Sequence, residues 1–468
     1  MSDAETLFSV LRQSADGDVV SAIEALVREA PDHALARVNA LDFARKRGLD
    51  EEQVIAAFLH AARLGLFEMS WNVLCPSCGG VLDANATLKS VRSAAYHCAF
   101  CAVSSEPTLD DLVEVTFMVN PRLRRIAAHD PDTLSSFEYL RQIFLSSGVD
   151  LPDDADARFQ DIAFDAVELP PGDKAILSLH VPEGSLILFD PVTHATQFLN
   201  VTGEPVRERQ GLTVIFNDVL AGTENVTLQP GPLRLSFENR SSKRVLPSLL
   251  RADERLHQFL DPRRPALTAK RLLTNQTFRD VYGTDTLDIE QRLKITSLTF
   301  LFTDLKESTS LYERVGDLAA YDLVRAHFQV LNGIVAAESG AVVKTIGDAV
   351  MATFPTPERA VAAAIRMREA MQRLGAERQR QDLTLKIGIH EGPCLAVVLN
   401  DRQDYFGQTV NIASRVQGLA ESRSIFASGT VVDNPSTTAL LKASGLVPTP
   451  QRRSVQGLSG ELAVYEIP

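Results

Sequence analysis

Two short apolar runs, each joined to an aspartate, restrict the fold of this chain most strongly. The run SLTFLFTD ends at Asp304, and KTIGDAVMATF places Asp348 between two further apolar runs. Their Thr, Val, Ile and Phe content favours strands, so we expect both carboxylates at strand ends in one cleft. Such a pair suits a divalent cation that also binds substrate phosphates. For either aspartate alone, the alternative is a helix cap or a turn.

A third motif, DYFGQTVNIASR, runs from Asp404 to Arg415. An acidic residue and a glycine-containing turn lead into an amphipathic helix, on which Asn411 and Arg415 are four residues apart and share a face. Lys344 lies four residues before Asp348, on the strand that enters the turn.

In this order, FTDLKEST, KTIGD and DYFGQTVNIASR resemble the class III nucleotidyl cyclases, the adenylate and guanylate cyclase homology domain. The likeness covers residues 295–468, a little over a third of the chain. It implies two Mg²⁺ or Mn²⁺ ions held by the side chains of Asp304 and Asp348 and by the backbone carbonyl of Leu305.

The same resemblance implies the substrate contacts. Lys344 and Asp404 correspond to the pair that reads the purine edge, and Thr309 to a further substrate-binding residue. Asn411 is implied to orient the ribose, and Arg415 to stabilise charge on the reacting phosphate. Guanylate cyclases of this family typically have Glu and Cys, or a small polar residue, at the two purine positions, so ATP is the expected substrate.

Two residues depart from this simple assignment. Glu307 occupies a loop position where many family members have a small residue, and its carboxylate either repels phosphate or points outward to solvent. We favour the outward direction, because Ser308 and Thr309 still supply helix N-terminal groups and Lys306 offsets the charge. His390 follows a strand-like run and is interpreted as a turn or packing histidine.

The strand and helix pattern of this region predicts a ferredoxin-like α+β domain with helices on one face of a mainly antiparallel sheet. In the family, the cleft forms between two such domains. One supplies the metal aspartates and the other the Lys, Asp, Asn and Arg. A homodimer with two composite sites follows from the resemblance, and a monomer should be inactive.

Four cysteines form the next motif, with Cys75 and Cys78 in CPSC and Cys98 and Cys101 in CAFC. This spacing falls in the range of zinc sites with two C-x₂-C knuckles, so we expect one structural Zn²⁺ per chain. Disulfides are the alternative, which a reducing cytosol disfavours. His97 could compete as a ligand, and the isolated Cys394 is interpreted as a packing residue.

Length and composition limit the rest. The chain of 468 residues allows about three domains, and its formal charge of −13 makes a nucleic-acid role unlikely. Neither an apolar run long enough for a membrane span nor a secretion signal is present, so we expect a soluble, cytoplasmic protein.

The fold class predicted for the whole chain is multidomain α+β, with five segments. They are a helical segment (residues 1–70), a zinc ribbon (71–125), a β-sandwich (126–245), a helical linker (246–292) and the cyclase domain (293–468). We expect adenylate cyclase activity with regulatory input from the N-terminal region, through a partner protein or ligand. The alternatives are a catalytically silent nucleotide sensor, a regulatory protein centred on the zinc module, and a guanylate cyclase.

Overall fold

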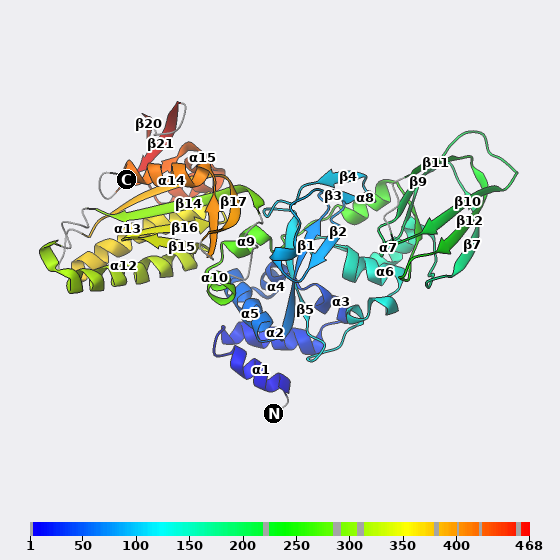
Figure 1. The fold of residues 1–468 in the computed structure, drawn as a ribbon, viewed down its shortest axis with the longest axis horizontal. Coiled ribbons are helices and arrows are strands. Elements are labelled where there is room, and N and C mark those ends of the chain that lie inside the picture. The colour runs from blue at the N-terminus through cyan, green and yellow to red at the C-terminus, as the bar shows by residue number, and fades with distance from the viewer. Residues whose placement is uncertain are drawn as a thin grey trace. The chain divides into compact units, whose positions relative to one another are not determined.

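The computed structural model describes residues 3–218, 224–283, 292–306, 313–378, 383–399, 402–420, 424–454 and 460–468. The chain divides into two compact units (Figure 1). The N-terminal unit comprises Met1–Pro107 and Asp111–Leu267, and the C-terminal unit comprises Thr108–Asp110 and Thr268–Pro468.

The N-terminal unit begins with helices that pack beside a small antiparallel sheet of order β2-β1-β5. The helices are α1 (Asp3–Leu11), α2 (Gly17–Glu29), α3 (Asp32–Ala36), α4 (Ala40–Arg47) and α5 (Glu51–Arg63), and the strands are β1 (Phe67–Leu74), β2 (Val81–Asn85) and β5 (Val113–Val119). Side chains of Asp16, Asn39 and Asp50 accept hydrogen bonds from the first turns of α2, α4 and α5, which fixes where these helices start. The ring of Phe58 contacts the rings of Phe43, Phe67 and Phe117, so α5 is anchored in the core.

The middle of this unit contains two sheets that share one apolar core. One has the order β10-β12-β7 and the other β11-β9-β8-β13-β6. The strands are β6 (Ala163–Ala166), β7 (Lys174–Val181), β8 (Gly184–Phe189), β9 (Thr196–Val201), β10 (Gln210–Phe216), β11 (Glu224–Leu228), β12 (Gly231–Asn239) and β13 (Ser248–Arg251). The last of these differs from the sequence prediction, because Ser248–Arg251 pairs with β6 and β8 instead of starting a helical linker.

Short elements complete the unit. They are the hairpin of β3 (Tyr96–Cys98) and β4 (Val103–Ser105), the helices α6 (Ser136–Tyr139), α7 (Ala155–Ile162) and α8 (Glu254–Leu260), a π-helical turn (Leu140–Phe144), and 3-10 turns at Leu88–Ser90, Ala127–His129 and Pro131–Thr133. Side chains of α6, α7, α8 and the π-helical turn form a second apolar cluster with Phe189.

The C-terminal unit is built on one sheet of order β15-β16-β14-β17-β19-β21-β20, with β18 paired to β17. The strands are β14 (Leu293–Leu305), β15 (Ala341–Ile346), β16 (Ala349–Phe354), β17 (Leu385–Leu399), β18 (Arg402–Phe406), β19 (Ile425–Ser428), β20 (Thr449–Ser454) and β21 (Glu461–Ile467). The hairpin around Gly347 and Asp348 is present, and among the described strands of this sheet β17 and β19 alone pair in parallel. Residues Leu385–Leu399 form the single long strand β17.

The helices of this unit cover both faces of the sheet, so the prediction of one covered face is wrong (Figure 1). Ile425 and Ala427 face the cluster formed with α12 (Asp317–Ala337) and α13 (Pro357–Glu377), whereas Phe426 packs with α14 (Gln408–Gly418). Successive side chains of a strand point to opposite faces, which places α14 opposite the other two helices. Residues 298–302 of β14 are all buried for the same reason.

Further helices flank this sheet. The unit also contains α9 (Ala269–Leu273), α10 (Gln276–Tyr282), α15 (Gly429–Val432) and α16 (Pro435–Ala443). The carboxylate of Asp110 accepts hydrogen bonds from the backbone N–H groups of Thr296 and Ser297 and pairs with Lys270. Residues 108–110 are thereby fastened to the start of β14. Among the described residues, no helix is both long and apolar enough to cross a membrane.

Candidate active site and metal centre

Asp304 and Asp348, the two predicted metal-binding aspartates, lie together. Asp304 is the penultimate residue of β14, and Asp348 occupies the turn between β15 and β16. A carboxylate oxygen of Asp348 accepts a hydrogen bond of 3.1 Å from the backbone N–H of Leu305. Strand β14 pairs directly with β16, so sheet register holds the turn beside the end of β14.

The electrostatics of this pair suit a cation. Burial raises the pKa of Asp304, and the negative charge of Asp348 raises it further, with only Lys386 opposing. Two neighbouring carboxylates that destabilise each other's charge form the donor set that a hard divalent ion neutralises. The residues therefore fit Mg²⁺ or Mn²⁺.

Lys344 and Asp404, the expected purine readers, form an ion pair. Lys344 comes from β15 and Asp404 from β18, and the Asp404 side chain is only 9% exposed. Its second carboxylate oxygen accepts a hydrogen bond from the N–H of Tyr405. Lys344 and Asp404 are 60 residues apart in sequence, and the tertiary fold brings their side chains into contact.

Helix α10 contacts the backbone next to each residue of this pair. Arg279 donates hydrogen bonds from one Nη to the carbonyl oxygens of Gln403 (2.9 Å) and Val343 (3.3 Å). Each acceptor precedes one purine reader along the chain. The sequence analysis missed Arg279, because nothing in the local pattern of α10 indicates contacts 64 and 124 residues away.

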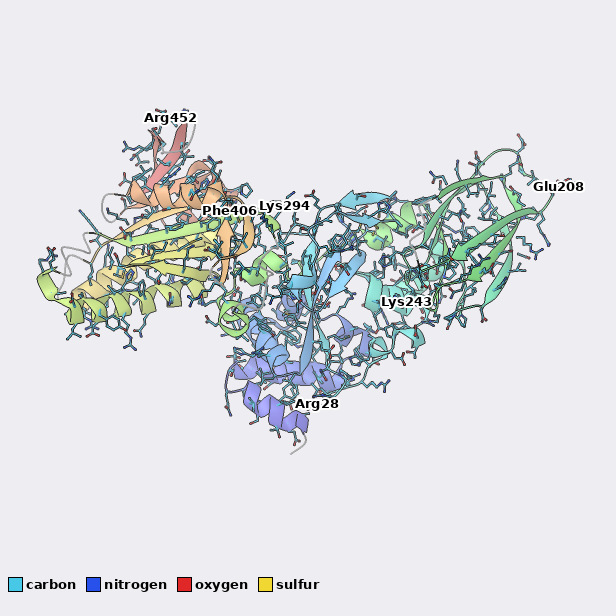
Figure 2. All side chains as sticks on the ribbon, in the orientation of Figure 1. Arg28, Glu208, Lys243, Lys294, Phe406 and Arg452 are labelled. Carbon is cyan, nitrogen blue, oxygen red and sulfur yellow. The ribbon has the colours of Figure 1, made fainter. Side chains whose placement is uncertain are left out.

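Asn411 and Arg415 lie on one face of α14, away from its buried residues Ile412, Ala413 and Val416. Asn411 is exposed and Arg415 half-buried, so a second molecule can reach both side chains. Beside the start of α14 is a cavity of about 340 Å³, lined in part by Lys294, Cys394 and the 63% exposed Phe406 (Figure 2).

Of the other residues singled out in the sequence, one has a packing role and two lie outside the described residues. Thr309 and Glu307 fall outside the described residues. His390 is buried and hydrogen-bonded to the hydroxyl of Ser428 at 2.7 Å, which agrees with a packing role. Burial lowers its pKa to about 4, so the ring is neutral near pH 7.

His327 on α12 is a titratable residue that the sequence analysis missed. Its ring is fully buried, and burial lowers its pKa to about 4 against the opposing influence of Asp348. A neutral imidazole thus lies near the metal aspartates. His327 occupies one position of the otherwise apolar buried face of α12, and this helical pattern does not indicate which distant residue lies beside it.

The four predicted zinc ligands converge in the N-terminal unit. One ligand atom from each of Cys75, Cys78, Cys98 and Cys101 lies within 4.8 Å of every other, and none of the four is in a disulfide. The sulfurs of Cys78 and Cys98 are 3.9 Å apart. A tetrahedral zinc site with Zn–S bonds of about 2.3 Å has sulfurs separated by roughly 3.8 Å, so this cluster fits the ion.

The neighbours of the cluster support the choice of ligands. The ring of His97 is instead hydrogen-bonded to the hydroxyl of Ser104. Cys394 is buried in the C-terminal unit, as expected of a packing residue.

Two family models match this chain. Residues 1–280 match the family of unknown function DUF5939, and residues 291–456 match the adenylate and guanylate cyclase catalytic domain. The first match covers more than half of the chain and ends within α10. The second covers the sheet except for β21 (Glu461–Ile467), and it includes the described site residues from Asp304 to Arg415.

Curated relatives match about a third of this chain. An adenylate cyclase from Mycosarcoma maydis is 31% identical over 31% of this chain and 7% of its own length. Adenylate cyclase 1 of Rhizobium meliloti is 26% identical over 36% of this chain and 27% of its own length. The chain thus spans well under two thirds of these relatives.

Among solved structures, the adenylyl cyclase CyaB from P. aeruginosa is 25% identical, with a TM-score of 0.34 over 38% of this chain and 96% of that chain.

Proposed function

We propose that this chain, which belongs to the DUF5939 family of unknown function and carries a nucleotidyl cyclase catalytic domain, converts ATP to 3′,5′-cyclic AMP and pyrophosphate. The observation that carries the proposal is the convergence of two carboxylates and a Lys–Asp pair on one sheet. The ribose 3′-hydroxyl attacks the α-phosphorus, and the bond to pyrophosphate breaks.

The metal site would use the carboxylates of Asp304 and Asp348 and the carbonyl of Leu305. Divalent ions bound there lower the pKa of the attacking hydroxyl and neutralise the phosphate oxygens. Arg415, supplied by the second subunit, places a permanently charged guanidinium against the α-phosphate as charge builds up. Asn411 orients the ribose so that the hydroxyl is aligned for attack.

The Lys344–Asp404 pair supports ATP as the substrate. Adenine presents a ring nitrogen that accepts a hydrogen bond and an exocyclic amine that donates one, which match an ammonium and a carboxylate respectively. Guanine has a carbonyl oxygen in place of that amine, and Asp404 would then face an acceptor with an acceptor. Because Asp404 is almost fully buried, such a mismatch is costly.

A homodimer is part of the proposal. The exposed side of α14 presents Asn411 and Arg415, while Asp304 lies near the end of β14 and Asp348 in the turn between β15 and β16. A second copy of the chain would complete each site, giving two equivalent centres related by a twofold axis. The N-terminal unit, with one structural Zn²⁺ held by its four cysteines, is proposed to be regulatory.

The test incubates purified protein with ATP or GTP and Mn²⁺ and measures the cyclic products. Cyclic AMP formation that exceeds cyclic GMP formation supports the proposal. A preference for GTP would make the chain a guanylate cyclase. Binding of ATP without turnover would make it a nucleotide sensor.

A further inference from the structure

The N-terminal unit contains a large cavity that is lined by several cationic side chains. Its residues are remote in sequence from the cyclase motifs. Its volume is about 520 Å³, within the range of small-molecule sites. It lies among α3, α4, the π-helical turn and the residues that follow that turn. Five residues that line it are cationic at neutral pH, namely Arg37, Lys46, Arg47, Arg141 and Arg264.

The residues that line the cavity carry a net positive charge, whereas the whole chain is negatively charged. The cavity wall contains only two carboxylates, Asp42 and Asp153, in a chain with a formal charge of −13. Three further carboxylates lie close to these cations. Glu138 pairs with Arg141, Asp150 pairs with Arg264, and Glu114 lies near Arg37. None of the three lines the cavity, whose own lining has five cations against two carboxylates.

Two of these guanidinium groups have unused donors. Among the described residues, Nη1 of Arg37 and Nε of Arg141 are buried without a hydrogen-bond partner. The other nitrogens of Arg37 donate to the carbonyl oxygens of Gln142 and Ile143, so its side chain is fixed in place. A buried N–H without an acceptor costs free energy, and a negative charge in the cavity would offset part of that cost through its attraction to the two guanidinium groups.

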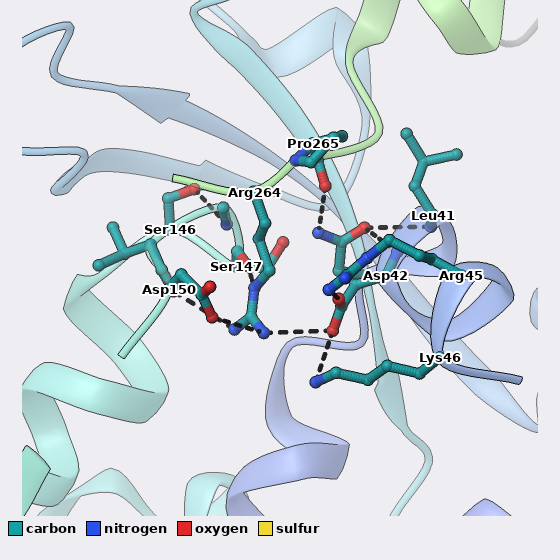
Figure 3. A network of polar contacts seen from close by, with 12 residues as sticks. Leu41, Asp42, Arg45, Lys46, Ser146, Ser147, Asp150, Arg264 and Pro265 are labelled. Carbon is teal, nitrogen blue, oxygen red and sulfur yellow. Dashed lines mark hydrogen bonds and ion pairs between the residues drawn. The ribbon is translucent and has the colours of Figure 1, made fainter. Parts of the chain in front are cut away.

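The carboxylate of Asp42, which lines the cavity, is bound by neighbouring cations (Figure 3). Its oxygens pair with Arg45 at 2.6 Å, Lys46 at 2.8 Å and Arg264 at 3.2 Å. Burial alone would raise the pKa of Asp42, but hydrogen bonds from Lys46 and Arg45 outweigh burial and lower it. One carboxylate is therefore held by three cations.

We propose that this cavity is a binding site for a small polyanion, a metabolite that carries phosphate or several carboxylate groups. Its anionic oxygens face the guanidinium charges of Arg37 and Arg141 and share Lys46 and Arg264 with Asp42. Arg264 also donates to the carbonyl oxygens of Ser147 and Val149, so it joins the wall to the chain segment that ends the unit at Leu267. The assignment does not depend on cyclase activity.

The test measures binding of inorganic pyrophosphate and of citrate, separately, to the full chain by calorimetry at low salt without added divalent ions. Lys46→Gln should weaken binding about 5- to 10-fold, the scale expected for removing one partly exposed cation. Asp42→Asn should strengthen binding, because it removes the competing carboxylate. Arg28→Gln is the matched control, since Arg28 on α2 is exposed, pairs with Glu29 and does not line the cavity (Figure 2).

The pattern of results decides the matter. Binding of pyrophosphate alone identifies phosphate chemistry, and binding of citrate alone identifies carboxylates. Absence of binding to both probes overturns the proposal, as does an equal loss in Lys46→Gln and Arg28→Gln. Pyrophosphate is also a proposed cyclase product, so Arg415→Ala serves as a further control. If that variant abolishes pyrophosphate binding, the anion occupies the catalytic site and the cavity assignment is wrong.

Discussion

Replacing Arg279 by methionine tests whether helix α10 holds the purine-reading pair in position. Methionine keeps much of the length and apolar packing of the arginine stem but removes the guanidinium. The hydrogen bonds to the carbonyl oxygens of Gln403 and Val343 are lost. Lys344 and Asp404 follow these carbonyls directly, so both strands gain freedom where the base is read.

The size of the effect follows from those two bonds. A hydrogen bond from a charged donor contributes about 1.5–3 kcal/mol, and the bond of 3.3 Å to Val343 is the weaker one. We expect about half of one such bond, ~0.8–1.5 kcal/mol, to appear as misplacement of the Lys344–Asp404 pair. That corresponds to about a 4- to 12-fold rise in KM for ATP. The kcat should change little, because no reacting atom is touched.

The assay compares kcat and KM for ATP, and the ATP-to-GTP ratio, in Arg279→Met, Arg279→Lys and Arg373→Met. Arg373 is exposed on α13 and controls for loss of a surface cation. Lysine should restore part of the affinity, since its ammonium still donates. An unchanged KM with an unchanged substrate ratio would refute the positioning role. A parallel fall in thermal midpoint and kcat, without a change in KM, would reduce Arg279 to a stability residue.

Four further outcomes are expected. Arg415→Ala should lower kcat by about 10²–10³ with little change in ATP binding, measured by steady-state kinetics. Asp304→Asn should abolish turnover yet raise the thermal midpoint of metal-free protein at pH 7. A raised carboxyl pKa costs stability as pH rises from the unfolded-state pKa to the folded-state pKa, so this gain should be complete above the folded-state pKa and vanish below about pH 3.9, the ordinary pKa of aspartate. Cys98→Ser should remove bound zinc, measured by elemental analysis, and lower the midpoint by on the order of 5–10 °C. Lys344→Glu with Asp404→Cys should weaken use of ATP and admit GTP, and an unchanged preference would show that the purine is read elsewhere.

Local patterns in the sequence were sufficient for much of the site. The apolar runs around Asp304 and Asp348 predicted strands, and sheet pairing brings those carboxylates together. The spacing of the four cysteines predicted a cluster that the structure contains. In each case the information lies within a few residues of chain, where strand periodicity and knuckle spacing operate.

The tertiary structure alone decided which residues support and surround these groups. Arg279 and Asp110 each act through two hydrogen bonds to distant backbone, and the cations of the polyanion cavity come from segments more than 200 residues apart. Helix α14 covers the face of the sheet opposite α12 and α13, although the uninterrupted apolar run of β14 already indicated burial on both faces. Short-range periodicity reports which faces are buried, but it does not specify which distant residues meet there, because that depends on how separate elements pack.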